Sequence, residues 1–285
     1  MTHKSKINCL ICPVIGAIAL LIITAGSLNA LVVSVDLGTA ANYTILAQTS
    51  LTAKPTSQII GDVAYDGPDS TPTGFFQIHN GATLPLTDYA TSDRIDGKMY
   101  ATNYSTTTQG QISQAITDRD AAYTQFVGLT GGTAQTGTDV VDGTVFNAGF
   151  YQWGAGFALT TQMVLSGNAT DVWVFKMGAL TMSGTSSILL TGGAIANNVF
   201  WYSASAATFA DGSNMVGNVL VETTVTVADN VQTLYSNLYA KTGVTLGANS
   251  LVTGIAVPVP ELASFSILAG VCVLGFALRR RVRKS

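Results

Sequence analysis

The sequence is poor in charged side chains. Asp, Glu, Lys and Arg make up 10% of its 285 residues, whereas about 25% is usual in globular domains. The net charge is −3 and no basic stripe crosses the middle of the chain, so nothing indicates a nucleic-acid partner. Gly is abundant at 29 residues and 47% of the residues are hydrophobic. The chain can therefore bury a large core and make many tight turns.

Cysteine and histidine are too scarce for common metal or catalytic sites. The three cysteines all lie in apolar terminal segments: Cys9, Cys12 and Cys272. Residues 31–257 therefore hold neither a disulfide nor a thiolate ligand. Of the two histidines, His3 lies near the N-terminus and His79 stands alone. The sequence thus predicts no metal site, no cofactor and no Ser-His-Asp arrangement.

Paired carboxylates remain the one catalytic alternative. Such a pair hydrolyses glycosidic bonds. The candidates Asp211, Glu222 and Asp229 stand at turn-like positions or strand ends, where Asp usually supports the turn. We therefore predict that the protein is not an enzyme.

Residues 1–30 have the features of a secretory signal peptide. Lys4 and Lys6 precede an apolar run at 7–25, and Ala30 is a small residue at a suitable cleavage point. An N-terminal membrane anchor is the alternative.

Residues 258–285 contain a second apolar segment. The sequence Pro-Val-Pro-Glu precedes an apolar run at 262–278, and a cluster of Arg and Lys follows it. A run of about 17 residues is just long enough to span a bilayer, with the basic tail in the cytoplasm. The segment resembles the Pro-Glu-Pro sorting signals of some Gram-negative bacteria, although Leu262 replaces the second Pro. We expect export to a secreted or cell-surface location, with membrane attachment before any processing; a permanent anchor is the alternative.

Short strand-like segments recur between residues 149 and 254. The first segment of each unit is rich in β-branched and aromatic residues, at 171–177, 198–203, 218–222 and 237–241. A second segment follows each, at 179–183, 207–210, 224–228 and 243–247. A third short apolar run then completes the unit. Three short strands per unit, separated by small turn residues, are the pattern of a β-solenoid coil.

The second segments predict an uncharged array on one face. Alternation directs large apolar residues inward and Thr or very small residues outward. The outward pairs, with one further unit upstream, are Ala158 and Thr160, Thr181 and Ser183, Thr208 and Ala210, Thr226 and Ala228, and Thr245 and Gly247. Strand propensity alone explains an outward Thr in one strand. The same feature in five strands favours a function, because solvent-facing strands normally carry Lys and Glu.

The N-terminal half adds a further coil and a loop-rich region. Thr49–Thr52 has the same pattern as residues 223–226 and 242–245. Each begins and ends with Thr, and between them stand a small residue or a further Thr and then an aliphatic residue. Residues 64–96 contain several Pro and Gly and little periodicity. We interpret them as a loop-rich excursion that caps one end of the stack.

One convincing helix is predicted, at about 107–127. Positions at spacings of three and four form one stripe: Ile112, Ala115, Ile116, Arg119, Ala122, Tyr123 and Phe126. We expect Thr106 or Thr107 to cap its start and Gly128 to end it. Its length of roughly 30 Å matches about six stacked strands. We therefore place it along one flank, over segments such as 172–175, with the Thr-bearing face uncovered.

Several motifs together resemble the microbial ice-binding proteins. They are VDLGTAANYTILAQT (35–49), DGKMYATNY (96–104), GFYQWGAGFALTTQMVLSGNATDVWVFKM (149–177), LTGGAIANNVFW (190–201) and AKTGVTL (240–246). The resemblance implies a mostly β, discontinuous, right-handed three-sided β-solenoid with one long α-helix on a flank, acting as a monomer. Residues 31–257 would form this ice-binding domain, with the N-terminal coil inserted beside later coils.

The resemblance also implies which residues contact ice. In that family, strands with Thr-small-X-Thr form one broad face that adsorbs to the ice crystal surface. The matching positions are Thr49 and Thr52, Thr223 and Thr226, and Thr242 and Thr245. Thr208, Thr181 and Thr160 occupy equivalent strand positions with looser motifs.

Two other functions stay open from the residues alone. A cell-surface adhesin or matrix protein could use the same fold, which the C-terminal segment favours. A polysaccharide-active β-helix enzyme would need a groove of clustered Asp, Lys and Arg, and the central part of the chain has too few charges for one.

Overall fold

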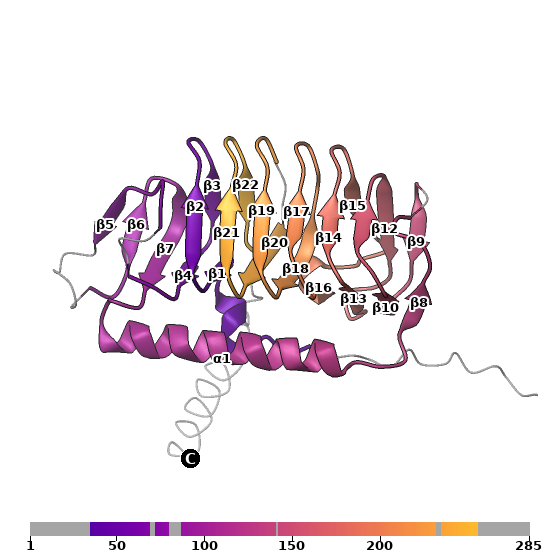
Figure 1. The fold of residues 1–285 in the computed structure, drawn as a ribbon, viewed down its shortest axis with the longest axis horizontal. Coiled ribbons are helices and arrows are strands. Elements are labelled where there is room, and N and C mark those ends of the chain that lie inside the picture. The colour runs from indigo at the N-terminus through magenta and orange to yellow at the C-terminus, as the bar shows by residue number, and fades with distance from the viewer. Residues whose placement is uncertain (1–34, 69–71, 80–86, 141, 232–234, 256–285) are drawn as a thin grey trace, which may run out of the picture. The chain divides into compact units, whose positions relative to one another are not determined.

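Short parallel strands dominate the structure. The computed structural model describes residues 35–68, 72–79, 87–140, 142–231 and 235–255, which all belong to one compact unit. Their strands form three sheets, here called A, B and C, of 13, six and three strands. All pairings are parallel except those that join β5, β6 and β7. Figure 1 shows the strands stacked side by side, with a single long helix running across them.

Sheet A is the largest of the three. Its main path runs β1-β4-β7-β3-β22-β20-β18-β16-β13-β10-β8, and β5 and β6 extend it beside β7. Its strands are β1 (Ile45–Ala47), β3 (Gln58–Ile60), β4 (Val63–Tyr65), β5 (Gln77–His79), β6 (Ala90–Ser92), β7 (Ile95–Ala101), β8 (Thr133–Gln135), β10 (Gly149–Trp153), β13 (Trp173–Met177), β16 (Val199–Ser203), β18 (Val216–Val221), β20 (Tyr235–Ala240) and β22 (Leu251–Thr253).

Sheet B supplies the second strand of the coils, and sheet C supplies a further strand to three of them. Sheet B runs β11-β14-β17-β19-β21-β2, and sheet C runs β15-β12-β9. The strands of sheet B are β2 (Ser50–Ala53), β11 (Phe157–Leu159), β14 (Leu180–Met182), β17 (Ala207–Phe209), β19 (Thr224–Val227) and β21 (Gly243–Leu246). Those of sheet C are β9 (Thr144–Phe146), β12 (Gln162–Ser166) and β15 (Ser187–Thr191). The predicted succession of three short strands is confirmed for β13, β14 and β15.

The inward side chains of all three sheets share one core. Phe175 stacks on Trp201 in the neighbouring coil, with 4.1 Å between ring centroids. Two buried indoles donate to backbone carbonyls, Trp173 Nε1 to Phe146 O at 3.0 Å and Trp201 Nε1 to Val216 O at 2.8 Å. The buried N–H of Trp153, by contrast, has no partner in the part of the chain that the structure describes. Burial and strand hydrogen bonds therefore hold the coils together with no disulfide among the described residues.

The N-terminal coil inserts beside the last coil. Ile45–Ala47 pairs with Leu238–Ala240 in sheet A, and Ser50–Ala53 pairs with Gly243–Leu246 in sheet B. The backbone N–H of Thr49 donates to Thr242 O at 2.6 Å. The discontinuity that the resemblance implied is thus present, and it adds a sixth strand to sheet B.

The region predicted as a loop-rich excursion is more ordered than expected. Within residues 64–96, β5 and β6 form an antiparallel pair that continues to β7, and these strands lie at one end of the stack (Figure 1). The sequence did not predict these strands, because they are too short to show periodicity between Pro and Gly residues.

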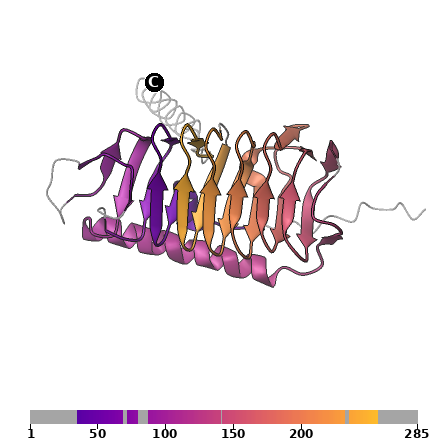
Figure 2. The same ribbon diagram turned by 45° about the horizontal axis from the view of Figure 1, so that its top comes forward.

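Helix α1 (Thr106–Gly128) packs on one side of sheet A, against strands that include β1, β13, β16, β18 and β20. Its buried residues include five of the predicted stripe: Ile112, Ala115, Ala122, Tyr123 and Phe126, which join a second apolar cluster with Leu46, Val174, Phe200, Tyr202, Leu220 and Tyr239 of sheet A. Figure 2 shows the helix running along the coils. Its N-cap is Ser105, not Thr106 or Thr107, since Ser105 Oγ accepts the N–H of Thr108 at 3.3 Å.

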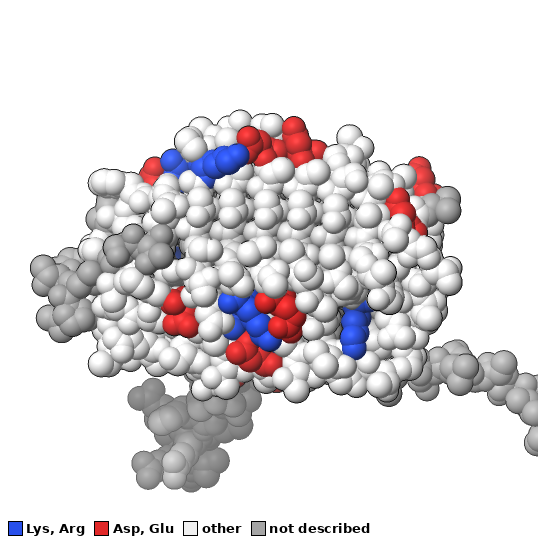
Figure 3. Space-filling model, in the orientation of Figure 1, with Lys and Arg blue, Asp and Glu red and all other residues white. Residues whose placement is uncertain are grey.

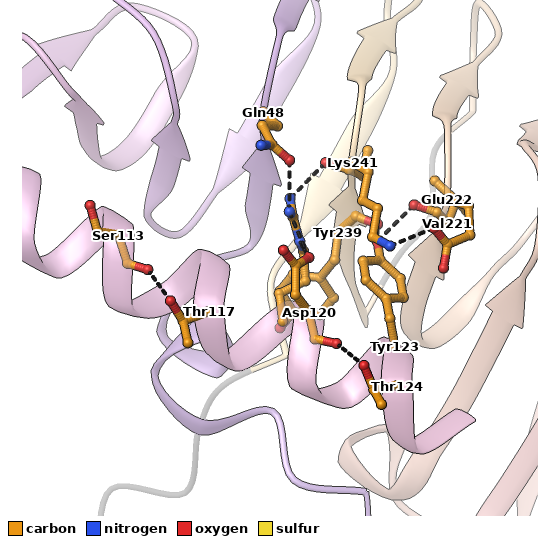
Figure 4. A network of polar contacts seen from close by, with 12 residues as sticks. Gln48, Ser113, Thr117, Asp120, Tyr123, Thr124, Val221, Glu222, Tyr239 and Lys241 are labelled. Atoms are coloured by element: carbon orange, nitrogen blue, oxygen red, sulfur yellow. Dashed lines mark hydrogen bonds and ion pairs between the residues drawn. The ribbon is translucent and has the colours of Figure 1, made fainter. Parts of the chain in front are cut away.

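Arg119, the sixth buried residue of the stripe, ties the helix to the inserted coil. Its guanidinium is 0% exposed and donates to Ala240 O at 3.0 Å and to Gln48 Oε1 at 2.8 Å. One side chain thereby bonds β20 and the end of β1 together, and Asp120 balances its charge at 2.9 Å. Nearby, Tyr123 Oη lies 2.7 Å from Val221 O and 2.9 Å from Tyr239 O. Figure 4 shows this polar network beneath the strands.

Replacing Arg119 with Met should destabilise the protein strongly. The substitution fills the space but leaves buried acceptors on Ala240 and Gln48 without a donor, at a cost of about 3 kcal/mol. Urea denaturation should show this loss, whereas Thr117→Ala on the exposed side of the same helix should stay within about 0.5 kcal/mol of wild type. Equal stability of R119M and wild type would show that the guanidinium bonds do not hold the inserted coil.

The hydrogen bonds of Asp118 should contribute to the stability of the folded protein, and this contribution should be lost at acid pH. Its carboxylate accepts Thr39 Oγ1 and Thr39 N at 2.7 Å each, which ties η1 (Gly38–Asn42) to α1. These two hydrogen bonds hold the pKa of Asp118 below its ordinary value of 3.8. A lowered folded-state pKa stabilises the protein above the unfolded pKa, and the benefit is lost as the pH falls through the folded-state pKa.

Melting temperatures from about pH 5 to about pH 2 should therefore fall less steeply for Asp118→Asn than for wild type. Identical slopes for the two proteins would rule out this contribution.

Candidate functional site

The centre of each strand of sheet B presents one outward side chain. The parallel register aligns these residues into one row, here called the central file: Ala158, Thr181, Thr208, Thr226, Thr245 and Thr52. The residues on either side of each point into the core and are buried, such as Val225 and Val227 beside Thr226. Adjacent members of the file therefore repeat at the strand spacing of about 4.8 Å.

A second row lies just before the strands, in the turns that lead into them. This turn file is linked by backbone hydrogen bonds from Thr223 to Ser205, from Thr242 to Thr223 and from Thr49 to Thr242. Ala155 and Gly178 continue it toward β11. The first Thr of each Thr-small-X-Thr motif thus lies in the turn file and the last Thr lies in the central file. The two rows run side by side along the sheet.

A third row follows the strands and holds the second residue of each predicted outward pair. This trailing file contains Thr160, Ser183, Ala210, Ala228 and Gly247, and it ends at Lys54 beside β2. The predicted equivalence of Thr160 with Thr181 was wrong, because the register aligns Thr181 with Ala158. Thr160 instead lies past the end of β11, where its N–H donates to Asp139 Oδ1 at 3.1 Å.

Gly247 is also not an outward residue. It is buried, and a Cβ there would lie 2.3 Å from the backbone of Ala228. The residue is therefore Gly because two turns approach closely, and it adds no side chain to the face.

Two outward hydroxyl groups, those of Ser50 and Thr224, were not predicted from the sequence. Alternation from Thr52 and Thr226 directs Ser50 and Thr224 to the same side of sheet B, in register with Gly243. Ser50 is exposed and Thr224 half-exposed. The Ser-X-Thr and Thr-X-Thr spacings are visible in the sequence, but the family motif includes only Thr residues three apart.

Charged side chains are confined to the borders of the face. The strands of sheet B contain no charged residue, and Figure 3 shows an uncharged band between two charged borders. On one border Lys54 pairs with Asp229 at 3.0 Å, and on the other Lys241 pairs with Glu222 at 2.5 Å. Helix α1 packs on sheet A and leaves sheet B uncovered (Figures 1 and 2).

A cavity between η1, β7 and α1 lies away from this face. It has a volume of about 820 Å³. Asp62 is the one carboxylate among the described residues that line it, so it lacks the pair that glycoside hydrolysis requires. In the described part of the chain no three His, Cys, Asp or Glu residues are grouped to hold a metal ion.

The predicted membrane segment lies outside the described residues, as does the predicted signal peptide. Within the described ranges, no helix has both the length and the apolar character needed to cross a bilayer.

Comparison with known proteins connects this fold to one family. The chain is 33% identical over 196 residues to an ice-binding protein of Typhula ishikariensis, covering 68% of this chain and 79% of that protein. It is 31% identical over 219 residues to an ice-binding protein of Flavobacterium frigoris, covering 76% and 75%. A solved ice-binding protein with antifreeze activity, from an Arctic yeast, superposes with a TM-score of 0.73 at 28% identity. That match covers 80% of this chain and 97% of the yeast protein.

The family described as Ice-binding-like matches residues 45–252, which contain all six strands of sheet B. With a match of this length, and with relatives of more than 30% identity over most of the chain, the protein belongs to the Ice-binding-like family.

Proposed function

We propose that this protein adsorbs to ice crystals through the central and turn files of sheet B, and so inhibits ice growth and recrystallisation. The observation that carries the proposal is the central file itself, in which five Thr stand in register on adjacent strands with no charge between them. The relatives named above are ice-binding proteins, and the yeast protein has antifreeze activity.

Recognition of ice must depend on the order of water, because ice and liquid water are the same substance. Thr methyl groups confine neighbouring water without binding it strongly, while Thr hydroxyls donate and accept hydrogen bonds at fixed positions. The strand spacing of about 4.8 Å repeats these groups at intervals close to lattice spacings in ice. Lys or Glu in the face would impose its own hydration instead.

Adsorption becomes effectively irreversible because many weak contacts form at the same time. Each Thr contributes little, but groups held at fixed spacing bind together, because the first contacts bring the others into place. The paired backbone and the apolar core supply the rigidity that this requires. A flexible array would lose conformational freedom on binding, and its affinity would fall.

The same proposal includes finer features of fold and location. We infer a right-handed three-sided β-solenoid from the three sheets and from the similarity to the yeast structure. Residues 1–30 and 258–285 support export to a secreted or cell-surface location, and the protein acts as a monomer without a cofactor. The adhesin alternative rests on residues 258–285 alone, and no contact in the described residues favours it.

The direct test is Thr226→Tyr, at the middle of the central file. Tyr is also a strand-forming residue, but its ring protrudes from the flat face and keeps the neighbouring side chains away from the ice. The substitution should therefore lower thermal hysteresis by roughly half or more. The activity is measured in a nanolitre osmometer. Thermal hysteresis equal to wild type in T226Y would contradict the proposed face.

Two controls separate binding from folding. The melting temperature of T226Y should match wild type, because Thr226 is exposed. Thr133→Tyr places the same ring on an exposed residue of β8 in sheet A and should leave thermal hysteresis unchanged. Wild-type protein that gives the same ice growth as buffer would refute the proposed function.

A further inference from the structure

The central file continues beyond the last strand of sheet B. Thr73 forms a parallel bridge with Thr52: its N–H donates to Leu51 O at 3.0 Å, and its carbonyl accepts the N–H of Ala53 at 2.9 Å. The hydroxyl groups of Thr73 and Thr52 lie 3.1 Å apart, and Thr73 is exposed. Its side chain therefore takes the next place in the row after Thr52, although it belongs to no strand of sheet B.

The segment that carries Thr73 is held firmly at this position. The guanidinium of Arg94 donates to Gly74 O and, at 3.0 Å, to Lys54 O. Gly74 has a φ of +86°, and a Cβ there would lie 1.8 Å from Ala53 O, so the two segments touch at the backbone. Thr73 is thus as well fixed as a strand residue.

The opposite end of the file has a different character. There the file ends in Ala158, which lacks a hydroxyl, and the backbone N–H of Ala158 donates to Thr138 O at 2.6 Å. The next residue, Asp139, is a charged neighbour whose carboxylate accepts both the N–H and the hydroxyl of Thr160. A carboxylate holds water in its own hydration shell, and the Thr160 hydroxyl is already donated.

The turn file shows the same gradient along the sheet. Ala155 and Gly178 occupy it beside β11 and β14, whereas hydroxyl residues occupy it beside the other four strands: Ser205, Thr223, Thr242 and Thr49. Both rows thus become richer in hydroxyls toward the inserted N-terminal coil.

From these observations, and resting on the proposed function, we propose that the ice-contact surface is displaced along sheet B. It reaches past the sheet edge to Thr73, and the Ala158 end contributes little. Ice would then be bound mainly by β17, β19, β21 and β2 together with the segment at Thr73. The inserted coil would lie inside the contact surface and not at its margin.

The test compares one ring at four positions in the full chain. Thr73→Tyr should lower thermal hysteresis about as much as T226Y, by roughly half or more, although Thr73 lies outside the sheet. Ala158→Tyr should lower it by less than half as much as T226Y, although Ala158 lies inside the sheet. T133Y serves as the control for an added surface ring. Thr73→Val, which keeps the shape and loses the hydroxyl, should give a smaller loss than T73Y.

The outcomes separate this inference from the proposed function. T73Y with wild-type activity, or A158Y as damaging as T226Y, would overturn the displacement while T226Y still supports the face. Loss of activity in T73Y with a lowered melting temperature, and no loss in T73V, would also overturn it, because folding would then explain the effect. A wild-type protein inactive on ice would remove the proposed function and the displacement with it.

Discussion

The pairing of the N-terminal coil with the last coil is the constraint on which the face depends. Without it, sheet B would end at β21, and Thr49, Ser50 and Thr52 would not join the other outward hydroxyls. The pairing joins segments 193 residues apart, so its formation closes a loop that contains most of the chain, at a cost in conformational entropy. The buried guanidinium of Arg119 bonds to both coils from the helix side. The helix therefore helps to build the face from the opposite side of the molecule.

The structure explains why the protein can fold with so few charged side chains. Stability comes from an enclosed apolar core and a nearly continuous set of backbone hydrogen bonds, neither of which needs surface ion pairs. The few charged side chains can therefore lie on the borders of sheet B, where Lys54 pairs with Asp229 and Lys241 pairs with Glu222. An uncharged, flat surface is costly for an ordinary soluble protein because it invites association. In this protein the uncharged, flat surface of sheet B is consistent with ice as the ligand.

Sequence periodicity predicted most of the face and could not predict its register. Alternation correctly directed Thr181, Thr208, Thr226 and Thr245 outward, because their neighbours are large and apolar. Alternation also grouped Thr160 with Ser183, which the register supports. The family motif instead made Thr160 equivalent to Thr181, because a short motif carries no information on which residues align between strands. Arg119 was placed in the buried helix stripe, but its carbonyl partner is 121 residues away and invisible to local pattern. Thr73 lies in a segment rich in Pro and Gly, where no periodicity marks an outward position.

In the proposed function, a rigid, uncharged array of Thr binds ice through many weak contacts at once. The most direct measurement exposes a single ice crystal to fluorescently labelled protein and then exchanges the surrounding solution for protein-free buffer. Many simultaneous contacts predict that fluorescence stays on the ice surface after the exchange. Fluorescence that washes away with the free protein would contradict the account.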